Sequence, residues 1–358
     1  MSILAPKISV LMGVYNGSCY LRESVSSILN QTFSNFEFVI IDDASNDNTW
    51  DILTSLSKQD ERIKLIRNKQ NIGLTRSLNK GLVIAQGELI ARQDADDISL
   101  PIRFEKQVQF LDQRPSAVLV SGCYEYIDAE GISFKTVRVA GGPDITAWYL
   151  LFYNRIGAHG LAMFRRQVVA EIGGYSEDYR YSQDYELWSR LVDTGDLVVL
   201  PDVLQLYRRD HDSSISVKFS SVQQDLALQV TAQNITNVIG EGMSKEALID
   251  LRNFWVGQYL EIQDIGALYA NLKKIHRAFI QQRSKIASYS GTGVSRRLGD
   301  VVLLRFLCWT NLFSSSHDWH RKAKVIRCAF LWNPVKAINL FSRRAFRNLP
   351  RSIKTFPI

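Results

Sequence analysis

The amino-acid sequence predicts an α/β protein in which a mostly parallel sheet is flanked by helices, with a helical extension at the C-terminal end. Short apolar runs rich in β-branched residues alternate with segments of helical period in the first part of the chain. Near residue 215 this alternation stops, and only helical periods follow. We therefore expect one α/β domain over residues 1–215 and a helical, basic region over residues 216–358, a size that suits one large domain with an appendage.

Four strands are expected early in the chain, because four runs are apolar and rich in β-branched residues. They lie at residues 8–12, 36–41, 63–66 and 88–91. Between them, apolar residues recur every three or four positions, as they do in helices with one buried face. The recurring residues are Leu21, Val25, Ile28 and Leu29, then Trp50, Leu53 and Leu56, then Leu78 and Leu82. Strands joined by helices in this way pair in parallel and bind ligands beyond their carboxyl ends.

Further strands are expected near residues 117–121, 161–164 and 197–200, with a helix over residues 185–193. Beyond residue 215 the apolar residues recur only at helical spacing. The two clearest series are Val222, Leu226 and Val230, and then Leu268, Leu272, Ile275 and Phe279. The C-terminal region is therefore expected to consist of helices.

The composition excludes several classes of protein. The chain is 46% hydrophobic and 22% charged, which is typical of a folded chain and not of a disordered one. Its four cysteines form no C-x-x-C pair, which argues against a zinc site or a disulfide framework and favours a reducing compartment. Residues 1–15 lack the pattern of a signal peptide, and the apolar stretch 301–313 contains Arg305 and is too short to span a bilayer. We expect a cytoplasmic protein.

Acidic residues directly follow two of the predicted strands. Asp43 follows one of them, and Asp94, Asp96 and Asp97 follow another. Because parallel strands end at the same edge of a sheet, both groups are expected in one crevice. Carboxylates this close repel one another unless solvent screens them or a cation neutralises them, and Mg²⁺ or Mn²⁺ shared with substrate phosphates suits such ligands. A solvated acidic loop is the alternative.

Eight segments, taken in chain order, add a more specific signal. They are Ile8–Asn16, Ser27–Phe33, Ile41–Asp47, Asn71–Leu74, Ala91–Asp97, Gly173–Tyr175, Ser182–Trp188 and Tyr207–Arg208. In these segments the chain resembles a family 2 glycosyltransferase of the GT-A fold, an inverting enzyme that uses nucleotide-sugar donors. The resemblance implies a Rossmann-like sheet and a nucleotide diphosphate-sugar donor, most simply a UDP-linked one.

The resemblance also implies roles for the acidic residues. Asp43 matches the aspartate that contacts the nucleotide base, and the ring of Tyr15 at the neighbouring strand end can cover that base or simply pack at the sheet edge. Asp94 and Asp96 match the D-x-D element that holds the sugar and the ribose-diphosphate. Asp96 is an expected ligand of Mn²⁺ or Mg²⁺, and Asp97 is either a second ligand or an orienting neighbour; the ion would stabilise negative charge on the departing diphosphate.

Asp184 matches the second residue of the family's E-D motif, in which the aspartate acts as general base. It would take a proton from the acceptor hydroxyl as that oxygen attacks the anomeric carbon. Gln183 stands where the family usually has glutamate, so no role carries over to that neighbour. Because Asp184 precedes a predicted helix, the alternative is a helix N-cap.

Four more residues are candidates for the site. Arg76 and Asn79 follow Gly73 and would bring hydrogen-bond donors toward the phosphates or the sugar, unless they lie on an exposed helix face. His159 resembles a family position on the acceptor side, and His211 resembles a late histidine near the diphosphate. Either histidine could instead be structural.

The C-terminal region is strongly basic. Residues 270–358 contain eighteen Lys or Arg and two Asp, for a net charge of +16, whereas residues 1–269 carry −9. Trp319, Ala323, Ile326 and Phe330 share one helical face, with Arg321, Lys322 and Lys324 off it, and Arg343, Arg344, Arg347 and Arg351 follow. Such a segment is typical of a helix lying on an anionic membrane surface. Nucleic-acid binding is disfavoured because no nucleic-acid-binding motif accompanies the positive charge. The other alternative is that this segment forms a homo-oligomer contact.

Together these features predict a glycosyltransferase, peripheral on the inner face of the cell membrane, that transfers a sugar to a hydroxyl of a glycan or lipid-linked glycan. The resemblance implies assembly of a surface polysaccharide such as capsule or O-antigen. A nucleotidyltransferase of similar fold is one alternative, although residues 15–17 form no glycine- and lysine-rich phosphate loop. A non-catalytic sugar- or membrane-binding protein is the other, and it would not need Asp184 together with the D-x-D cluster.

Overall fold

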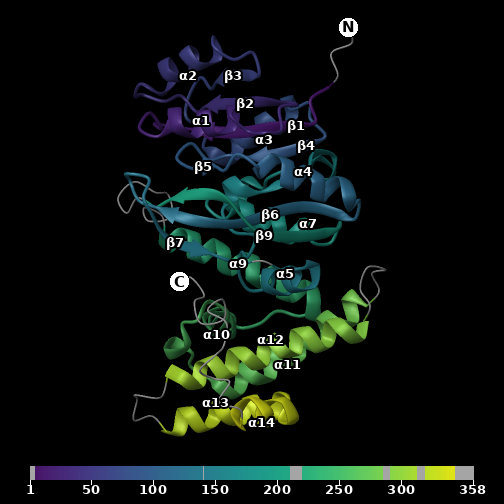
Figure 1. Cartoon of the computed structure of the whole chain (residues 1–358). Helices are drawn as coiled ribbons and strands as arrows, with labels where there is room; N and C mark the ends of the chain where they lie inside the picture. The colour runs from purple at the N-terminus through teal and green to yellow at the C-terminus, as the bar shows by residue number, and fades with distance from the viewer. Residues whose placement is uncertain (1–4, 140, 210–219, 285–290, 313–318, 343–358) are drawn as a thin grey trace. The chain divides into compact units, whose positions relative to one another are not determined.

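The computed structural model describes residues 5–139, 141–209, 220–284, 291–312 and 319–342. These residues form two compact units, which are coloured by residue number in Figure 1. Unit 1 contains the described residues up to 146 and residues 154–227, and unit 2 contains residues 147–153 and those from 228 onward. The predicted boundary at residue 215 lies outside the described residues. Sequence periodicity did not indicate that the short segment 147–153 belongs with the C-terminal helices.

Unit 1 is built on one sheet, to which nine strands of the described chain contribute. In chain order they are β1 (Ile8–Val14), β2 (Phe36–Asp42), β3 (Ile63–Arg67), β4 (Leu89–Arg92), β5 (Ile98–Ser99), β6 (Ala117–Ile127), β7 (Ser133–Val137), β8 (Met163–Arg165) and β9 (Asp196–Arg208). Their order across the sheet is β3-β2-β1-β4-β8-β6-β9-β5, with β7 paired to β6. Parallel pairings join β3, β2, β1 and β4 and also join β6 to β9, as the strand–helix alternation predicted.

Antiparallel pairings complete the sheet, between β8 and its neighbours β4 and β6, between β7 and β6, and between β5 and β9. The strand predicted at 161–164 begins later, at Met163, because residues 159–161 form the single helical turn η1 (His159–Leu161). Two strands escaped prediction. β5 has only two residues, and four of the five residues of β7 are exposed, so neither carries an apolar run.

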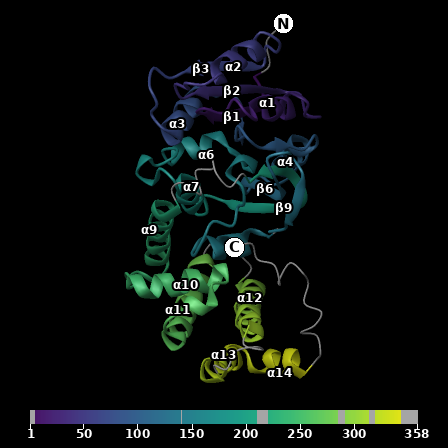
Figure 2. The same ribbon diagram turned by 90° about the vertical axis from the view of Figure 1, so that its left-hand side faces the viewer.

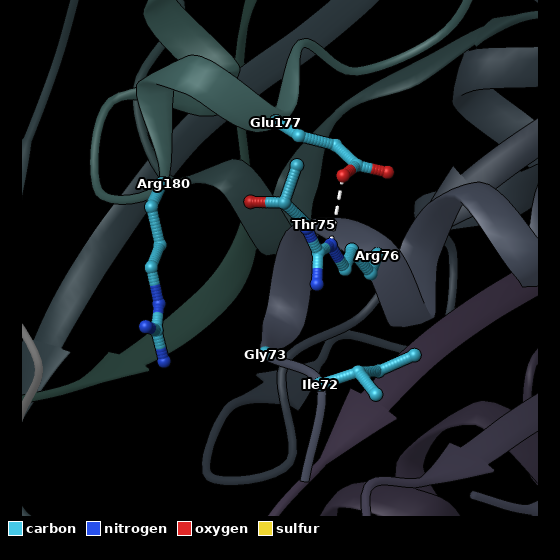
Figure 3. A pocket seen from close by; sticks show the side chains of 6 residues that line it. All are labelled: Ile72, Gly73, Thr75, Arg76, Glu177 and Arg180. Carbon is cyan, nitrogen blue, oxygen red and sulfur yellow. Dashed lines mark hydrogen bonds and ion pairs between the residues drawn. The ribbon is translucent and has the colours of Figure 1, made fainter.

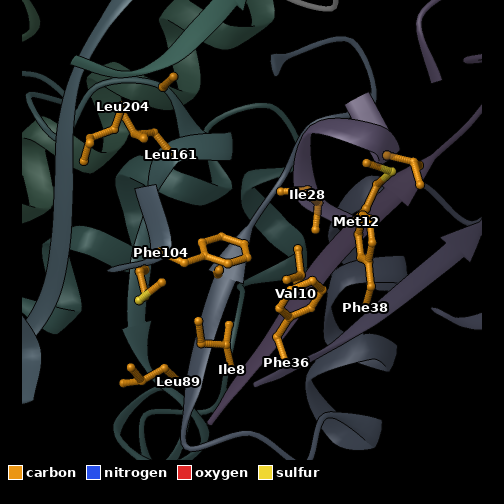
Figure 4. Close-up of a cluster of buried hydrophobic side chains, with 14 of the residues drawn as sticks. Ile8, Val10, Met12, Ile28, Phe36, Phe38, Leu89, Phe104, Leu161 and Leu204 are labelled. Atoms are coloured by element: carbon orange, nitrogen blue, oxygen red, sulfur yellow. The ribbon is translucent and has the colours of Figure 1, made fainter. Parts of the chain in front are cut away.

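Helices cover both faces of the sheet. Those of unit 1 are α1 (Leu21–Leu29), α2 (Thr49–Ser57), α3 (Leu74–Ile84), α4 (Arg103–Gln113), α6 (Arg166–Glu171) and α7 (Gln183–Leu191), together with the turn η2 (Glu177–Tyr179). Figure 4 shows the core on one face, where Val10 and Met12 of β1 pack with Ile28 of α1. Leu11 points to the other face, against Gly81 of α3, where a Cβ would lie 2.1 Å from the Leu11 side chain. A strand buried on both faces is therefore mostly apolar, which is why β1 could be predicted.

Unit 2 is helical, as predicted. It contains the last turns of α5 (Pro143–Leu150), most of α9 (Ser220–Ile239), then α10 (Lys245–Val256), η3 (Tyr259–Glu261), α11 (Ile265–Arg283), α12 (Gly291–Leu312), α13 (Trp319–Trp332) and α14 (Pro334–Ser342). Its core is aromatic, with the Trp148 ring 5.3 Å from Phe279 and 5.8 Å from Trp255. Ser244 caps α10 at its start and Gly257, at φ 92°, ends it.

The basic helices of unit 2 differ from the predicted pattern in one respect. Val325, Cys328 and Ala329 form the buried face of α13, whereas Ala323 is exposed and Ile326 and Phe330 are half-buried. Figure 2 shows α13 and α14 beside α12. The side chain of Trp319 and residues 343–358 lie outside the described residues. In the part of the chain that the structure describes, every helix is too short or too polar to cross a bilayer.

Candidate active site

The D-x-D residues lie in the loop between β4 and β5, held by a buried arginine. Arg92, the last residue of β4, is fully buried, and its Nη2 lies 2.6 Å from Asp94 Oδ1. Its Nη1 donates to the backbone carbonyls of Leu11 and Gln93. Gly160 lies against the other side of Asp94, since a Cβ there would come within 2.9 Å of Asp94 Oδ2. The orientation of Asp94 is therefore fixed from both sides.

Asp96 and Asp97 have different environments. Asp97 is buried, and its oxygens accept hydrogen bonds from Gln205 Nε2 and from the Arg208 backbone N–H, both at 2.9 Å. Desolvation and the charges of Asp96 and Asp94 raise the pKa of Asp97 well above its usual range. The Asp96 side chain is exposed, yet desolvation by the surrounding atoms and the Asp94 charge raise its pKa to about 6. The repulsion expected from the sequence is thus present.

This repulsion bears on the expected divalent cation. No three His, Cys, Asp or Glu side chains of the described residues gather closely enough to enclose a metal ion. A divalent cation held by one or two carboxylates and completed by substrate phosphates fits these residues, since hard cations bind through such oxygens. Asp96 is the exposed carboxylate of the group. The predicted role of Asp97 as a ligand stays a prediction, with both of its oxygens already hydrogen-bonded to protein in this conformation.

Asp184 lies in the first turn of α7, facing the same site. Its Oδ2 accepts a hydrogen bond from Asn154 Nδ2 at 2.8 Å, and its Oδ1 accepts one from the Tyr185 N–H at 2.7 Å. Desolvation first, and then the Asp94 charge, raise its pKa to about 6. A chain of contacts links α7 to the D-x-D loop, because the Trp188 ring of α7 lies 6.0 Å from the His159 ring and His159 Nε2 lies 3.3 Å from Nε of Arg92, the partner of Asp94. The N-cap position of α7 belongs to Ser182, so the alternative role of Asp184 as N-cap is wrong.

A network behind Asp94 includes His159. The His159 Nε2 atom lies 2.9 Å from the Tyr175 hydroxyl and accepts from Arg92 Nε at 3.3 Å. Since Arg92 can only donate, this nitrogen is unprotonated and the ring proton resides on Nδ1. Desolvation and the Arg92 charge lower the pKa of His159 well below its usual value, so the ring is neutral at physiological pH. His211 lies outside the described residues.

Asp43 and Tyr15 lie at the carboxyl ends of β2 and β1. Asp43 is buried, and its carboxylate accepts from Asn68 Nδ2, from the Ile72 N–H and from the Gly73 N–H, at 2.8, 2.9 and 2.8 Å. It thereby fixes the loop that leads into α3. Tyr15 is 47% exposed, so part of its side chain is accessible to a ligand.

Arg76 lies at the edge of a cavity of about 160 Å³ between the start of α3 and η2. Its Nε forms an ion pair with Glu177 Oε2 at 2.7 Å, which Figure 3 shows with a dashed line. Asn79 is neither on an exposed face nor open to a ligand. Its amide donates to the Tyr175 carbonyl at 2.8 Å and accepts from the Tyr175 N–H at 2.9 Å, which fastens α3 to the segment before η2.

Comparison with known proteins identifies the family. Residues 9–173 match the profile described as glycosyl transferase family 2. An uncharacterized glycosyltransferase of Haemophilus influenzae is 36% identical over 241 residues, which cover 64% of this chain and 74% of the relative. The chain belongs to the family 2 glycosyltransferases. The O-antigen biosynthesis glycosyltransferase WbnJ of Escherichia coli is also similar, at 33% identity over 52% of this chain and 71% of WbnJ.

Solved structures show that this glycosyltransferase has the GT-A fold. S. aureus TarS (1–349) in complex with UDP-GlcNAc aligns with a TM-score of 0.56 and 17% identity, over 76% of this chain and 82% of that one. The mannosyltransferase PcManGT of Pyrobaculum calidifontis, in complex with GDP-Man and Mn²⁺, aligns with a TM-score of 0.50 and 16% identity, over 96% and 91%. The Rossmann-like fold predicted from the motifs is thus confirmed.

Sequence reasoning missed several residues that build the site of this glycosyltransferase. Arg92, Asn154, Tyr175 and Arg208 orient the predicted carboxylates and the histidine. None of them was given a role from the sequence, although all but Asn154 lie in segments that carry the family resemblance. Arg208 is 4% exposed and reaches across from β9, donating to the Asp96 carbonyl at 3.0 Å and to Glu23 Oε2 at 2.6 Å. The one available signal was a charged residue inside an otherwise apolar strand, as at Arg92, because such a residue must find partners within the fold.

Proposed function

We propose that this glycosyltransferase is inverting and moves one sugar from a UDP-linked donor to a hydroxyl group of a glycan or lipid-linked glycan. The observation that supports the proposal is the contact network between α7 and the D-x-D loop, in which the Trp188 ring lies 6.0 Å from the His159 ring and His159 accepts from Arg92, the partner of Asp94. The similarity to TarS, whose structure contains UDP-GlcNAc, supports a nucleotide-sugar donor. The similarity to WbnJ supports assembly of a surface polysaccharide of the O-antigen or capsule type.

In this proposal Asp184 is the general base. Its carboxylate accepts the proton of the acceptor hydroxyl while that oxygen forms a bond to the anomeric carbon. The bond from the anomeric carbon to the diphosphate oxygen breaks in the same step, so the configuration inverts. Asn154 holds the carboxylate in place through its amide, at 2.8 Å. Gln183, beside the base, carries no charge that would compete for the proton.

On the donor side, Tyr15 would cover the nucleotide base and Asp43 would position the loop beside it. Asp94 and Asp96 would bind the ribose and the sugar. Asp96, with Asp97 as the second candidate, would hold Mn²⁺ or Mg²⁺, and the PcManGT structure with Mn²⁺ supports this choice of metal. When bound, the ion supplies positive charge where the leaving diphosphate becomes negative. Arg76 would add a guanidinium to the donor site once its exposed ion pair with Glu177 opens.

On the acceptor side, we propose that neutral His159 orients the acceptor through its Nδ1 hydrogen. Its other nitrogen is occupied by Tyr175 and Arg92, so it is not the base. His211 remains a candidate for a residue that lies near the diphosphate of the donor.

For its location, we propose that the enzyme is cytoplasmic and binds the inner face of the cell membrane through α13 and α14. His320, Lys324 and Arg327 are exposed on α13. Leu331 near the end of α13, and Val335 and Ile338 of α14, are 54%, 70% and 55% exposed. Cations next to exposed apolar side chains favour an anionic bilayer. A homo-oligomer contact through the same surface is the competing proposal, and nucleic acid is not an expected partner.

The test of the proposed activity uses the purified full chain, a panel of UDP- and GDP-sugars, and Mn²⁺. We expect slow release of nucleoside diphosphate from one donor without acceptor, faster release when a glycan acceptor is added, and loss of both with EDTA. Release of pyrophosphate would instead indicate a nucleotidyltransferase. Binding of the sugar nucleotide without turnover under all these conditions would indicate a non-catalytic protein.

A further inference from the structure

The cavity beside Arg76 has features that the proposed roles above do not explain. It lies between the first turn of α3 and η2, within unit 1, and has a volume of about 160 Å³. Its lining residues are Ile72, Gly73, Thr75, Arg76, Glu177 and Arg180, all of which Figure 3 labels. Sites for drug-sized ligands are about twice this volume or more, so the cavity suits one small group and not a whole nucleotide sugar.

The first turn of α3 lines this cavity. Gly73 is the N-cap residue at φ 89° and has no side chain of its own to cap the helix. The Asp43 carboxylate accepts hydrogen bonds from the Gly73 N–H and from the Ile72 N–H. The N–H groups of a first helical turn have no partners within the helix, and the aligned peptide dipoles favour negative charge there. The helix has eleven residues, which is long enough for this effect to develop. The first-turn N–H groups after Gly73 can therefore donate to a small anion. The buried Asp43 carboxylate already carries negative charge beside them, so a bound anion needs the positive charge of Arg180 and Arg76, which also line the cavity.

Thr75 provides an independent indication of a ligand. Its side chain is 97% buried, at 3% exposure, and among the described residues its Oγ1 atom has no hydrogen-bond partner. A buried hydroxyl without a hydrogen-bond partner is energetically unfavourable, and a bound ligand would supply that partner. In Figure 3 this oxygen points into the space between α3 and Arg180.

Arg180 supplies the positive charge. Its side chain is exposed, and no carboxylate of the described residues forms an ion pair with it. Gly73 leaves room for its guanidinium, because a Cβ at residue 73 would lie 3.4 Å from Arg180 Nε. Arg76, across the cavity, is paired with Glu177 through side chains that are 59% and 51% exposed. A pair this exposed is weak, so an incoming anion can displace the Glu177 carboxylate.

From these contacts we propose that the cavity binds a phosphate group, held by the Thr75 hydroxyl and the Arg180 guanidinium at the start of α3. The Thr75 hydroxyl and the first-turn N–H groups donate hydrogen bonds to phosphate oxygens, and Arg180 adds charge-assisted ones. Two sources carry this chemistry: the nucleotide donor and a phosphate-bearing acceptor. The choice between them rests on the proposed function, whereas the site itself does not.

The test measures binding of inorganic phosphate and of UDP to the full chain by calorimetry. Thr75→Val removes the hydroxyl and keeps the side-chain shape, and Arg180→Gln removes the charge. We expect each change to weaken phosphate binding roughly tenfold, the usual effect of losing one charge-assisted hydrogen bond. Glu177→Gln removes the competing carboxylate and should strengthen binding a few-fold. Lys64→Ala, on the exposed part of β3, removes one charge elsewhere and should change nothing.

The UDP measurements distinguish the two sources of phosphate. If UDP binding weakens in the Thr75 and Arg180 variants together with phosphate binding, the donor supplies the group. If only phosphate binding weakens, the group comes from another molecule, and either result supports the site. Wild-type protein that binds no phosphate, or variants that bind it as wild type does while their unfolding temperatures are unchanged, would overturn it. Donor turnover by the wild type is measured separately, so the proposed activity can stand when the phosphate site fails.

Discussion

Asp94 is held by Arg92 in an ion pair of 2.6 Å, in which the arginine side chain is fully buried and the carboxylate is 26% exposed. The same guanidinium reaches Leu11 of the neighbouring strand and His159 of the loop before β8. A buried charge is tolerated when its donors are engaged, and Arg92 engages them on three separate segments. One residue therefore connects the D-x-D loop, the central strand and the histidine.

Arg92→Lys should impair both activity and stability, because one ammonium cannot replace the planar fork of donors. We expect kcat/KM for transfer to fall by at least about tenfold and the free energy of unfolding to fall by about 2 kcal/mol. Arg62→Lys, at a partly exposed pair with Asp60, is the matched control and should cost less than about 1 kcal/mol. Wild-type kinetics in the Arg92 variant would show that Asp94 does not depend on this contact.

Gly160→Ala should disturb the same carboxylate from its other side. The new Cβ would lie 2.9 Å from Asp94 Oδ2 and 3.0 Å from Gln205 Nε2, so Asp94 must move or the loop must shift. We expect weaker donor binding, with a loss of stability of about 1–3 kcal/mol from overpacking. Gly242→Ala, which meets nothing within 4 Å, should leave donor affinity and stability unchanged. Donor titrations and urea unfolding of both variants provide the measurement.

The rate of transfer should depend on pH through Asp184. A base must be deprotonated, and burial and the Asp94 charge raise the pKa of this carboxyl to about 6. We expect kcat/KM to be level above about pH 7 and to fall about tenfold per pH unit below about pH 6. Asp184→Asn should abolish transfer at every pH while leaving donor affinity within about threefold. A variant that remains active would remove Asp184 as the base.

Asp184→Asn should also change how stability depends on pH. The folded-state pKa of Asp184 lies above the usual 3.8, so the native state binds more protons than the unfolded state between these two values. The ionised carboxylate therefore destabilises the wild type progressively as the pH rises from about 4 to about 6. Relative to the wild type, the variant should gain up to roughly 3 kcal/mol over this interval and then stay level. Urea unfolding at several pH values tests this, and a constant difference would contradict it.

Much of the fold could be predicted because its signals are local. Strands such as β1 are buried on both faces, so most of their residues are apolar and the run is visible in the sequence. Asp43 and Asp94 could be placed at strand ends because they follow such apolar runs. They could be expected in one crevice because parallel strands end at the same edge of a sheet. β5 and β7 are too short or too exposed to leave an apolar pattern.

The supporting residues could not be predicted, because their partners are distant in sequence. Arg208 meets the D-x-D loop from β9, 112 positions after Asp96, and Asn154 meets Asp184 across 30 positions. No periodicity specifies such contacts. The possible role of Thr75 could not be predicted either, because nothing in the sequence distinguishes it from any other threonine in a helix. Only the structure shows that its hydroxyl is buried and has no hydrogen-bond partner among the described residues.

The exposed surface of α13 and α14 leads to the last prediction, which concerns membrane binding. Lys324→Glu combined with Arg327→Glu reverses two exposed charges, and each cation near an anionic surface contributes about 1 kcal/mol. We expect the double variant to bind vesicles containing phosphatidylglycerol at least about tenfold more weakly than the wild type. Vesicle flotation of the full chain, with pure phosphatidylcholine as reference, provides the measurement.

Three further results decide between the membrane and a second copy of the chain as the occupant of this surface. Leu331→Ser with Val335→Ser removes exposed apolar side chains without changing the charge, and should also weaken binding if these residues enter the bilayer. Lys58→Glu with Lys64→Glu, in unit 1, makes the same change of charge elsewhere and should leave vesicle binding unchanged. If the wild type does not bind anionic vesicles but forms dimers, and the serine double variant is monomeric, the surface joins two protomers and the membrane proposal is wrong.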